Sequence, residues 1–184
     1  MQTSSLNLTR RYLLALGFIA ALSIAAFVIL RSAITAQETG AAVVNVAGRQ
    51  RMLSQRISRF ALLYVIAEDA TERESLKQTL VNDLALFEES HNGLLNGGSV
   101  RGLTSGETLI LPGSPSPTVY GMYFQAPMNL DEQVTTFIAE TRALLADPES
   151  ALTHDNTHLV YVVKAAAADI LAGLNAVTGQ YQGN

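Results

Sequence analysis

The chain has no cysteine among its 184 residues, and only 15% of its residues are charged. The lack of cysteine excludes a disulfide scaffold, a cysteine-ligated metal site and a thiol nucleophile. There is no basic tail and the net charge is −4, which argues against a nucleic-acid partner. With 48% hydrophobic residues, the chain is too apolar to be disordered. Its length leaves room for one folded domain and one membrane element.

The longest apolar run extends from Tyr12 to Leu30. As a helix it spans roughly 29 Å, the thickness of a bilayer core. Arg10 and Arg11 precede it, so the positive-inside rule places residues 1–11 in the cytoplasm. Residues 12–31 are then a single transmembrane helix in the inner membrane of a bacterium, and residues 32–184 lie in the periplasm. The alternative is a cleaved signal peptide, for which this run is long.

Residues 32–184 show helical spacing of apolar residues in four segments. The first predicted helix continues from the membrane to about Ala67, and its inward stripe consists of Val43, Val46, Gln50, Leu53, Ile57 and Phe60. The second begins with a capping box at Thr71 and ends at Gly97, with His91 as a packed core residue. The remaining two run from Leu130 to Leu145 and, after a cap at Asp147, to Tyr181.

Residues 96–128 contain six glycines and four prolines. This composition predicts one long irregular loop without a helix, with a short hairpin formed by residues 108–111 and 119–124. We therefore expect an all-α fold: an antiparallel four-helix bundle that continues from the transmembrane helix.

Arginines gather in the first helix of this bundle. Arg49, Arg51, Arg56 and Arg59 lie within eleven positions, and no acidic residue occurs between Glu38 and Glu68. The region after Arg31 is acidic as a whole, with nine basic against sixteen acidic residues. Four neighbouring arginines repel one another unless they are solvated, pair with distant carboxylates or bind an anion. Their planar guanidinium groups match the oxygens of nitrate, carboxylate or phosphate.

Helical geometry divides these arginines between two faces. Asn45, Arg49 and Arg56 share one flank, whereas Arg51 lies on another side. The neighbours of Arg51 are small or weakly polar: Ala41, Val44, Gly48 and Gln55. Such a face can meet the same helix of a second subunit about a two-fold axis, where two Arg51 side chains converge on one anion. Without a ligand, the arginines form a solvated face or salt bridges, and this reading stays open.

The segment Asn45–Arg56, NVAGRQRMLSQR, resembles the signature of PilJ-type sensor domains, the N-terminal periplasmic modules of type IV pilus chemotaxis transducers. It is similar also to a box in nitrate/nitrite sensor kinases. The family pattern is Asn-x-Ala-Gly-x-x-Arg-Met-x-Ser-x-Arg. The matching residues are Asn45, Ala47, Gly48, Arg51, Met52, Ser54 and Arg56.

The resemblance implies a membrane-anchored homodimer of four-helix bundles that senses a small anion. Arg51 occupies the position at which nitrate sensors hold one anion between two subunits, and Arg56 is the later arginine of the motif. The candidate ligand-binding residues are Arg51, Gly48, Arg56, Asn45 and Met52. Arg49-Gln50 and Gln55 depart from the nitrate sensors and match the pilus-transducer variant, whose ligand is less defined.

We therefore predict sensing across the inner membrane, with a helix shift as the signal and with no catalysis, cofactor or metal in this chain. His154 and His158 are spaced for a metal on a helix, but a polar surface explains them better. The alternative function is a non-catalytic envelope adaptor whose bundle binds another protein through its arginines.

Overall fold

The computed structural model describes residues 3–102 and 106–183. The chain divides into two compact units, Met1–Thr39 and Gly40–Asn184. The predicted cytoplasmic tail begins with residues 1–2, which lie outside the described part, and its remaining residues are helical from Thr3.

Helix α1 (Thr3–Ile66) contributes to both units, and its two parts differ in burial. Every residue from Arg10 to Thr35 is exposed, as expected for an apolar segment that lipid would cover. From Ala42 onward the helix carries a buried stripe that agrees with the predicted one, except that Phe60 is only partly buried. The helix ends at Ile66, one residue before the predicted end.

Helix α2 (Ala70–Asn96) begins earlier than the predicted capping box at Thr71. Its N-cap is Asp69, whose side chain accepts a hydrogen bond from the backbone N–H of Glu72, so the box prediction is wrong. The predicted end is confirmed, because Gly97 follows the helix with a φ of 73°. A side chain there would be strained and would also meet the backbone of Pro112.

The segment predicted as an irregular loop is largely ordered. Strand β1 (Gly98–Arg101) pairs antiparallel with β2 (Thr108–Leu111), so the strand at 108–111 is confirmed but its partner is not the predicted one. Residues 119–124 belong to a helix, α3 (Pro117–Phe124). Ser116 caps α3 with Pro117 in its first turn, and Val119 and Tyr123, four residues apart, are buried.

Helix α4 (Leu130–Ala146) confirms the third predicted helix. The fourth prediction is wrong in two respects. After Asp147 comes only a short 3-10 turn, η1 (Glu149–Ala151), and helix α5 (Thr157–Ala167) is capped by Asn156. A break at Ala168 then separates α5 from α6 (Asp169–Gln182).

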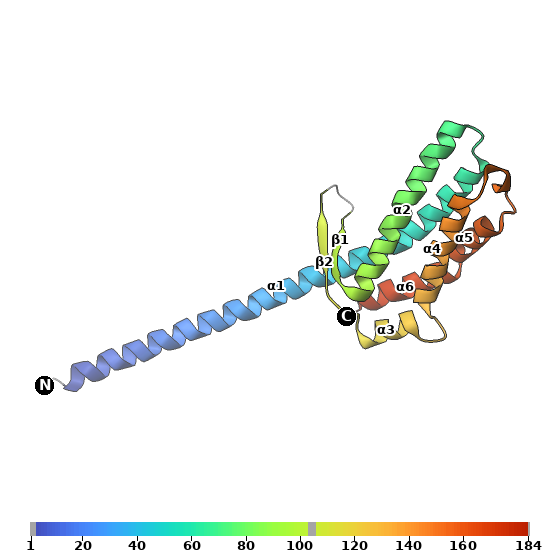
Figure 1. Cartoon of the computed structure of the whole chain (residues 1–184). Coiled ribbons are helices and arrows are strands. Elements are labelled where there is room, and N and C mark those ends of the chain that lie inside the picture. Colours follow the sequence, from blue (N-terminus) through green and yellow to red (C-terminus); the bar gives the residue numbers. More distant parts are fainter. Residues whose placement is uncertain (1–2, 103–105, 184) are drawn as a thin grey trace. The chain divides into compact units, whose positions relative to one another are not determined.

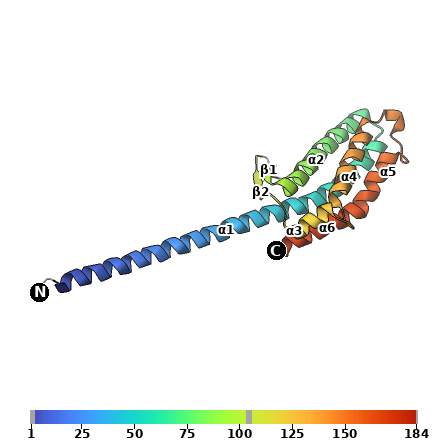
Figure 2. The same cartoon turned by 60° about the horizontal axis from the view of Figure 1, so that its bottom comes forward.

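The Gly40–Asn184 unit is predominantly α-helical, and its long helices run antiparallel as predicted (Figures 1 and 2). Its main core includes Leu53 and Ile57 of α1, Phe87 of α2, Phe137 of α4 and Ile170 of α6. A second, smaller cluster packs the hairpin against α1 and α2: Ala42, Val43, Val46, Ala47, Leu94, Val100 and Leu111. This cluster fixes the hairpin beside the arginine-rich part of α1.

Candidate functional site

Two of the four clustered arginines face α2, on the flank that helical geometry predicts. The Nε of Arg56 lies 2.7 Å from Oδ2 of Asp83, and its guanidinium stacks 5.3 Å from the ring centre of Phe60. Burial raises the pKa of Asp83, and the hydrogen bond and charge of Arg56 oppose that rise. Arg56 therefore has a carboxylate partner within its own chain.

Arg49 is the most buried of these arginines, with 5% of its surface exposed. Its Nη2 donates to Oγ of Ser90 at 2.9 Å, and its Nη1 donates to the carbonyl of Arg101 in the hairpin. Its Nε is buried without a hydrogen-bond partner among the described residues. Burial lowers the pKa of Arg49, and Arg101 adds to this, whereas Glu89 and Glu107 act in the opposite direction. The arginine thus fastens the hairpin to α1 and α2 while keeping spare donor capacity.

Arg51 points away from α2 and is exposed. Its Nη1 donates to Oδ1 of Asn175 on α6 at 3.1 Å, and one turn later Gln55 donates to the carbonyl of Ala166 at 2.5 Å. No carboxylate pairs with Arg51 within residues 3–102 and 106–183. Arg51 is therefore a solvated cation with one neutral partner.

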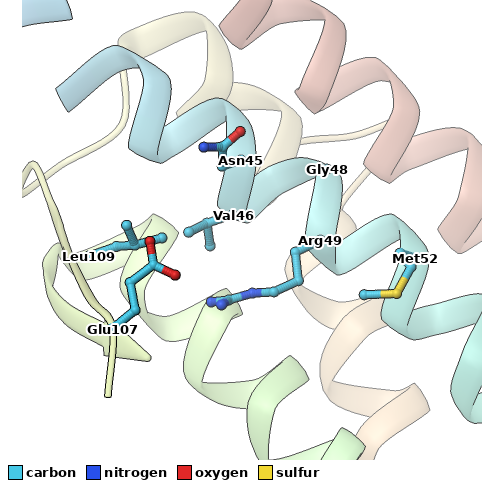
Figure 3. Close-up of a pocket in the computed structure, with 7 residues that line it drawn as sticks. All are labelled: Asn45, Val46, Gly48, Arg49, Met52, Glu107 and Leu109. Carbon is cyan, nitrogen blue, oxygen red and sulfur yellow. The ribbon is translucent and has the colours of Figure 1, made fainter. Parts of the chain in front are cut away.

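A pocket of about 470 Å³ lies between α1 and the hairpin (Figure 3). Its lining residues are Asn45, Val46, Gly48, Arg49 and Met52 from α1, and Glu107 and Leu109 from the hairpin. Three of the five predicted ligand-binding residues, Asn45, Gly48 and Met52, are thus brought together here. Arg51 and Arg56 are not among its lining residues.

Sequence reasoning missed the hairpin side of this pocket and the role of Arg49. The shared flank of Asn45 and Arg49 was a usable signal, because both line the pocket. The strand at residues 108–111 was predicted, but its pairing with residues 98–101, which brings Glu107 to α1, was not.

The histidines do not form one cluster in the described structure. His91 is 3% exposed, as predicted for a core position, and its Nε2 lies 2.7 Å from Oδ1 of Asp131. His154 and His158 do not share a helix, because α5 begins only at Thr157, so the helical spacing that could have suited a metal is not formed. His158 instead contacts Glu140 on α4 at 2.7 Å.

Comparison with protein families gives one decisive observation. Residues 33–114 match the family model described as "Type IV pili methyl-accepting chemotaxis transducer N-term", named PilJ. Over residues 33–114, this chain is similar to the PilJ family. The match contains the Asn45–Arg56 motif, α2 and the hairpin. No curated protein and no solved structure matches the chain.

The PilJ match supports a role in signal transduction in a family that is sensory rather than catalytic. Among the described residues, two helical stretches are long and apolar enough to cross a membrane: Arg10–Ile66 and Thr157–Gln182. The apolar window of the first is fully exposed, whereas α5 and α6 of the second bury Leu159, Ile170 and other residues in the core. The first stretch and the family together point to membrane anchoring.

Proposed function

We propose that this PilJ-type chain is a single-pass sensor of the bacterial inner membrane whose C-terminal domain lies in the periplasm. The orientation follows from Arg10 and Arg11, which precede the apolar part of α1. Binding of a small anion such as nitrate or nitrite outside the membrane would shift helix α1 and so signal to the cytoplasm.

The ligand would be held by two Arg51 side chains from a homodimer. The observation that carries this proposal is the state of Arg51 in one chain: exposed, bonded to a single neutral amide, and without a carboxylate partner in the described residues. Two such cations brought together repel each other, so an anion between them stabilises the pair. Arg56 is a weaker ligand candidate, because Asp83 already neutralises it.

An exposed seam on α1 supports the homodimer. Its positions alternate by four and three residues, which is the spacing of a coiled-coil contact: Ala41, Asn45, Gly48, Met52, Gln55, Arg59, Leu62 and Ile66. All are exposed or partly exposed, and Ile66 has 64% of its surface in solvent. A side chain added at Gly48 would meet nothing within 4 Å in the single chain, so a second helix can approach closely there. Arg51 borders this seam.

The anion site is tested on the full chain in detergent micelles by its melting temperature in nitrate, nitrite and chloride. A ligand at 100 times its dissociation constant stabilises the folded state by about 2.7 kcal/mol. We expect nitrate or nitrite to raise the melting temperature, and Arg51→Ala to abolish the rise. Arg51→Lys should weaken it, because an ammonium group lacks the planar fork. Arg142→Ala, at an exposed arginine of α4, is the control.

The same responses in the wild type and in Arg51→Ala would refute the anion site. A chain that responds to no anion and instead binds an acidic partner protein would favour the adaptor function.

The homodimer is tested by disulfide cross-linking, for which the absence of cysteine is convenient. We expect Leu62→Cys and Met52→Cys, on the seam, to form disulfide-linked dimers in nanodiscs under mild oxidation. Ser75→Cys, at an exposed position of α2, should stay monomeric. Equal cross-linking of the three variants would show that the seam is not a specific contact.

A further inference from the structure

The pocket between α1 and the hairpin is not used by the anion site at Arg51, and its walls carry opposite charges. Arg49 lines one side and Glu107 the other, with the amide of Asn45 nearby (Figure 3). The remaining side chains are apolar: Val46, Met52 and Leu109. Its volume of about 470 Å³ lies within the usual range of small-molecule sites.

We propose that this pocket binds a small zwitterion with an apolar body, that is, a free α-amino acid with an apolar side chain. The ligand carboxylate would bind the guanidinium of Arg49, and the ammonium group would bind Glu107 and the Asn45 amide oxygen. The apolar side chain would lie against Val46 and Leu109.

The state of Arg49 supports the carboxylate end. The side chain is 95% buried, and its Nε has no hydrogen-bond partner among the described residues. A buried donor without a partner costs free energy, which a ligand oxygen can recover. Arginine matches a carboxylate in shape as well as charge. The bonds to Ser90 and Arg101 hold the guanidinium in place, so little order has to be gained on binding.

The placement of Glu107 supports the ammonium end. Its side chain lies against Gly102, the residue that follows β1, where an added Cβ would lie 2.4 Å from its Oε2. The backbone N–H of Gly102 also donates to the carbonyl of Glu107 at 2.8 Å. The hairpin thus holds this carboxylate at the pocket, where an inorganic anion would be repelled and a zwitterion would not.

The experiment measures the melting temperature and the binding isotherm of the full chain in detergent micelles with L-valine, L-leucine, L-isoleucine, L-methionine and L-phenylalanine. 4-Methylpentanoate and isopentylamine serve as the leucine analogues that lack one charge. We expect at least one amino acid to bind saturably and each single-charge analogue to bind at least tenfold more weakly. Failure of all five amino acids, or equal binding of the carboxylate analogue, would overturn the proposal.

Two variants at the hairpin test the site without touching buried Arg49. Glu107→Gln removes the partner of the ammonium group at an exposed position, and Leu109→Trp fills the pocket. Both should weaken amino-acid binding at least tenfold, whereas the control Glu68→Gln, at another exposed glutamate, should not. Unchanged binding in both hairpin variants would contradict the proposal.

This inference does not depend on Arg51, although Asn45, Gly48 and Met52 belong both to the pocket lining and to the proposed seam. Arg51→Ala should abolish the nitrate response and leave amino-acid binding intact, and Glu107→Gln should do the reverse. Failure of one proposal is therefore distinguishable from failure of the other.

Discussion

Gly93 of α2 is a position at which the hairpin packs tightly against the bundle. A Cβ at this residue would lie 2.3 Å from Cγ1 of Val100 and 3.1 Å from Cδ1 of Leu111. Val100 is β-branched and 1% exposed, so its methyl group has little room to move. We predict that Gly93→Ala destabilises the folded chain by displacing the hairpin.

The magnitude follows from two opposing effects. Alanine is better than glycine inside a helix by roughly 0.5–1 kcal/mol, whereas overpacking a core costs about 1–3 kcal/mol. The expected net loss is about 1–2 kcal/mol. For a chain of this size, each kcal/mol lowers the melting temperature by about 2–4 °C. The wild type and the variant are compared by circular dichroism in detergent, where the melting temperature should fall by about 2 to 8 °C.

The matched control is Gly179→Ala in α6, where an added Cβ meets nothing within 4 Å. This variant should be as stable as the wild type or more stable by up to about 1 kcal/mol. Gly93→Ala combined with Val100→Ala should cost less than the sum of the two single changes, because the clash is removed. If Gly93→Ala melts at or above the wild-type temperature, the packing argument is wrong.

The other predictions concern polar groups of the bundle. Burial lowers the pKa of His91 despite Asp131, so the folded state favours the neutral ring and the unfolded state takes up a proton below its usual pKa of about 6.5. The stability of the folded chain should therefore be full above pH 6.5 and fall as the pH drops below it. His91→Leu should flatten that part of a plot of melting temperature against pH. An equal decline in the variant would contradict this. Arg56→Ala should cost about 1 kcal/mol, a small value because Arg56 is half exposed, and Asp83→Asn in the same chain should restore part of it in urea unfolding. Ser90→Ala should cost about 1–3 kcal/mol by leaving a buried donor of Arg49 unpaired, while Ser75→Ala should cost little.

The long helices were predictable because the residues that they bury recur in the sequence at helical spacing. The buried stripe of α1 and the inward residues of α4 follow helical periodicity, and Gly97 marks the end of α2. Their caps were less predictable. Asp69 and Thr71 are both acceptable N-caps in the sequence, and only the structure shows that Asp69 makes the cap bond.

The hairpin and α3 were hidden for a different reason. Glycine and proline dominate residues 96–128, so local signals favour a loop, yet Val100 and Leu111 gain a buried contact with α1 and α2 that no local pattern reports. Pro117 counted as evidence against a helix, although it is the first residue of α3. The missed wall of the pocket, Glu107 and Leu109, depends on this same long-range pairing.

Within the site, the sequence identified the right stretch of α1 but not the task of each arginine. Composition shows an arginine excess without nearby acids, and it cannot show that Asp83 lies one helix away. Periodicity did separate Arg49 and Arg56 from Arg51, and the structure confirms that division.

Hydrogen bonds tie α1 to its neighbours in two directions within less than two turns. Arg49 reaches Ser90 of α2, while Gln55 caps a carbonyl freed by the break after α5. Sliding α1 by 1–2 Å inside its own bundle would break both bonds at once. The bundle part of α1 therefore does not slide within its own chain, and a shift of α1 between two chains would carry each whole bundle with it.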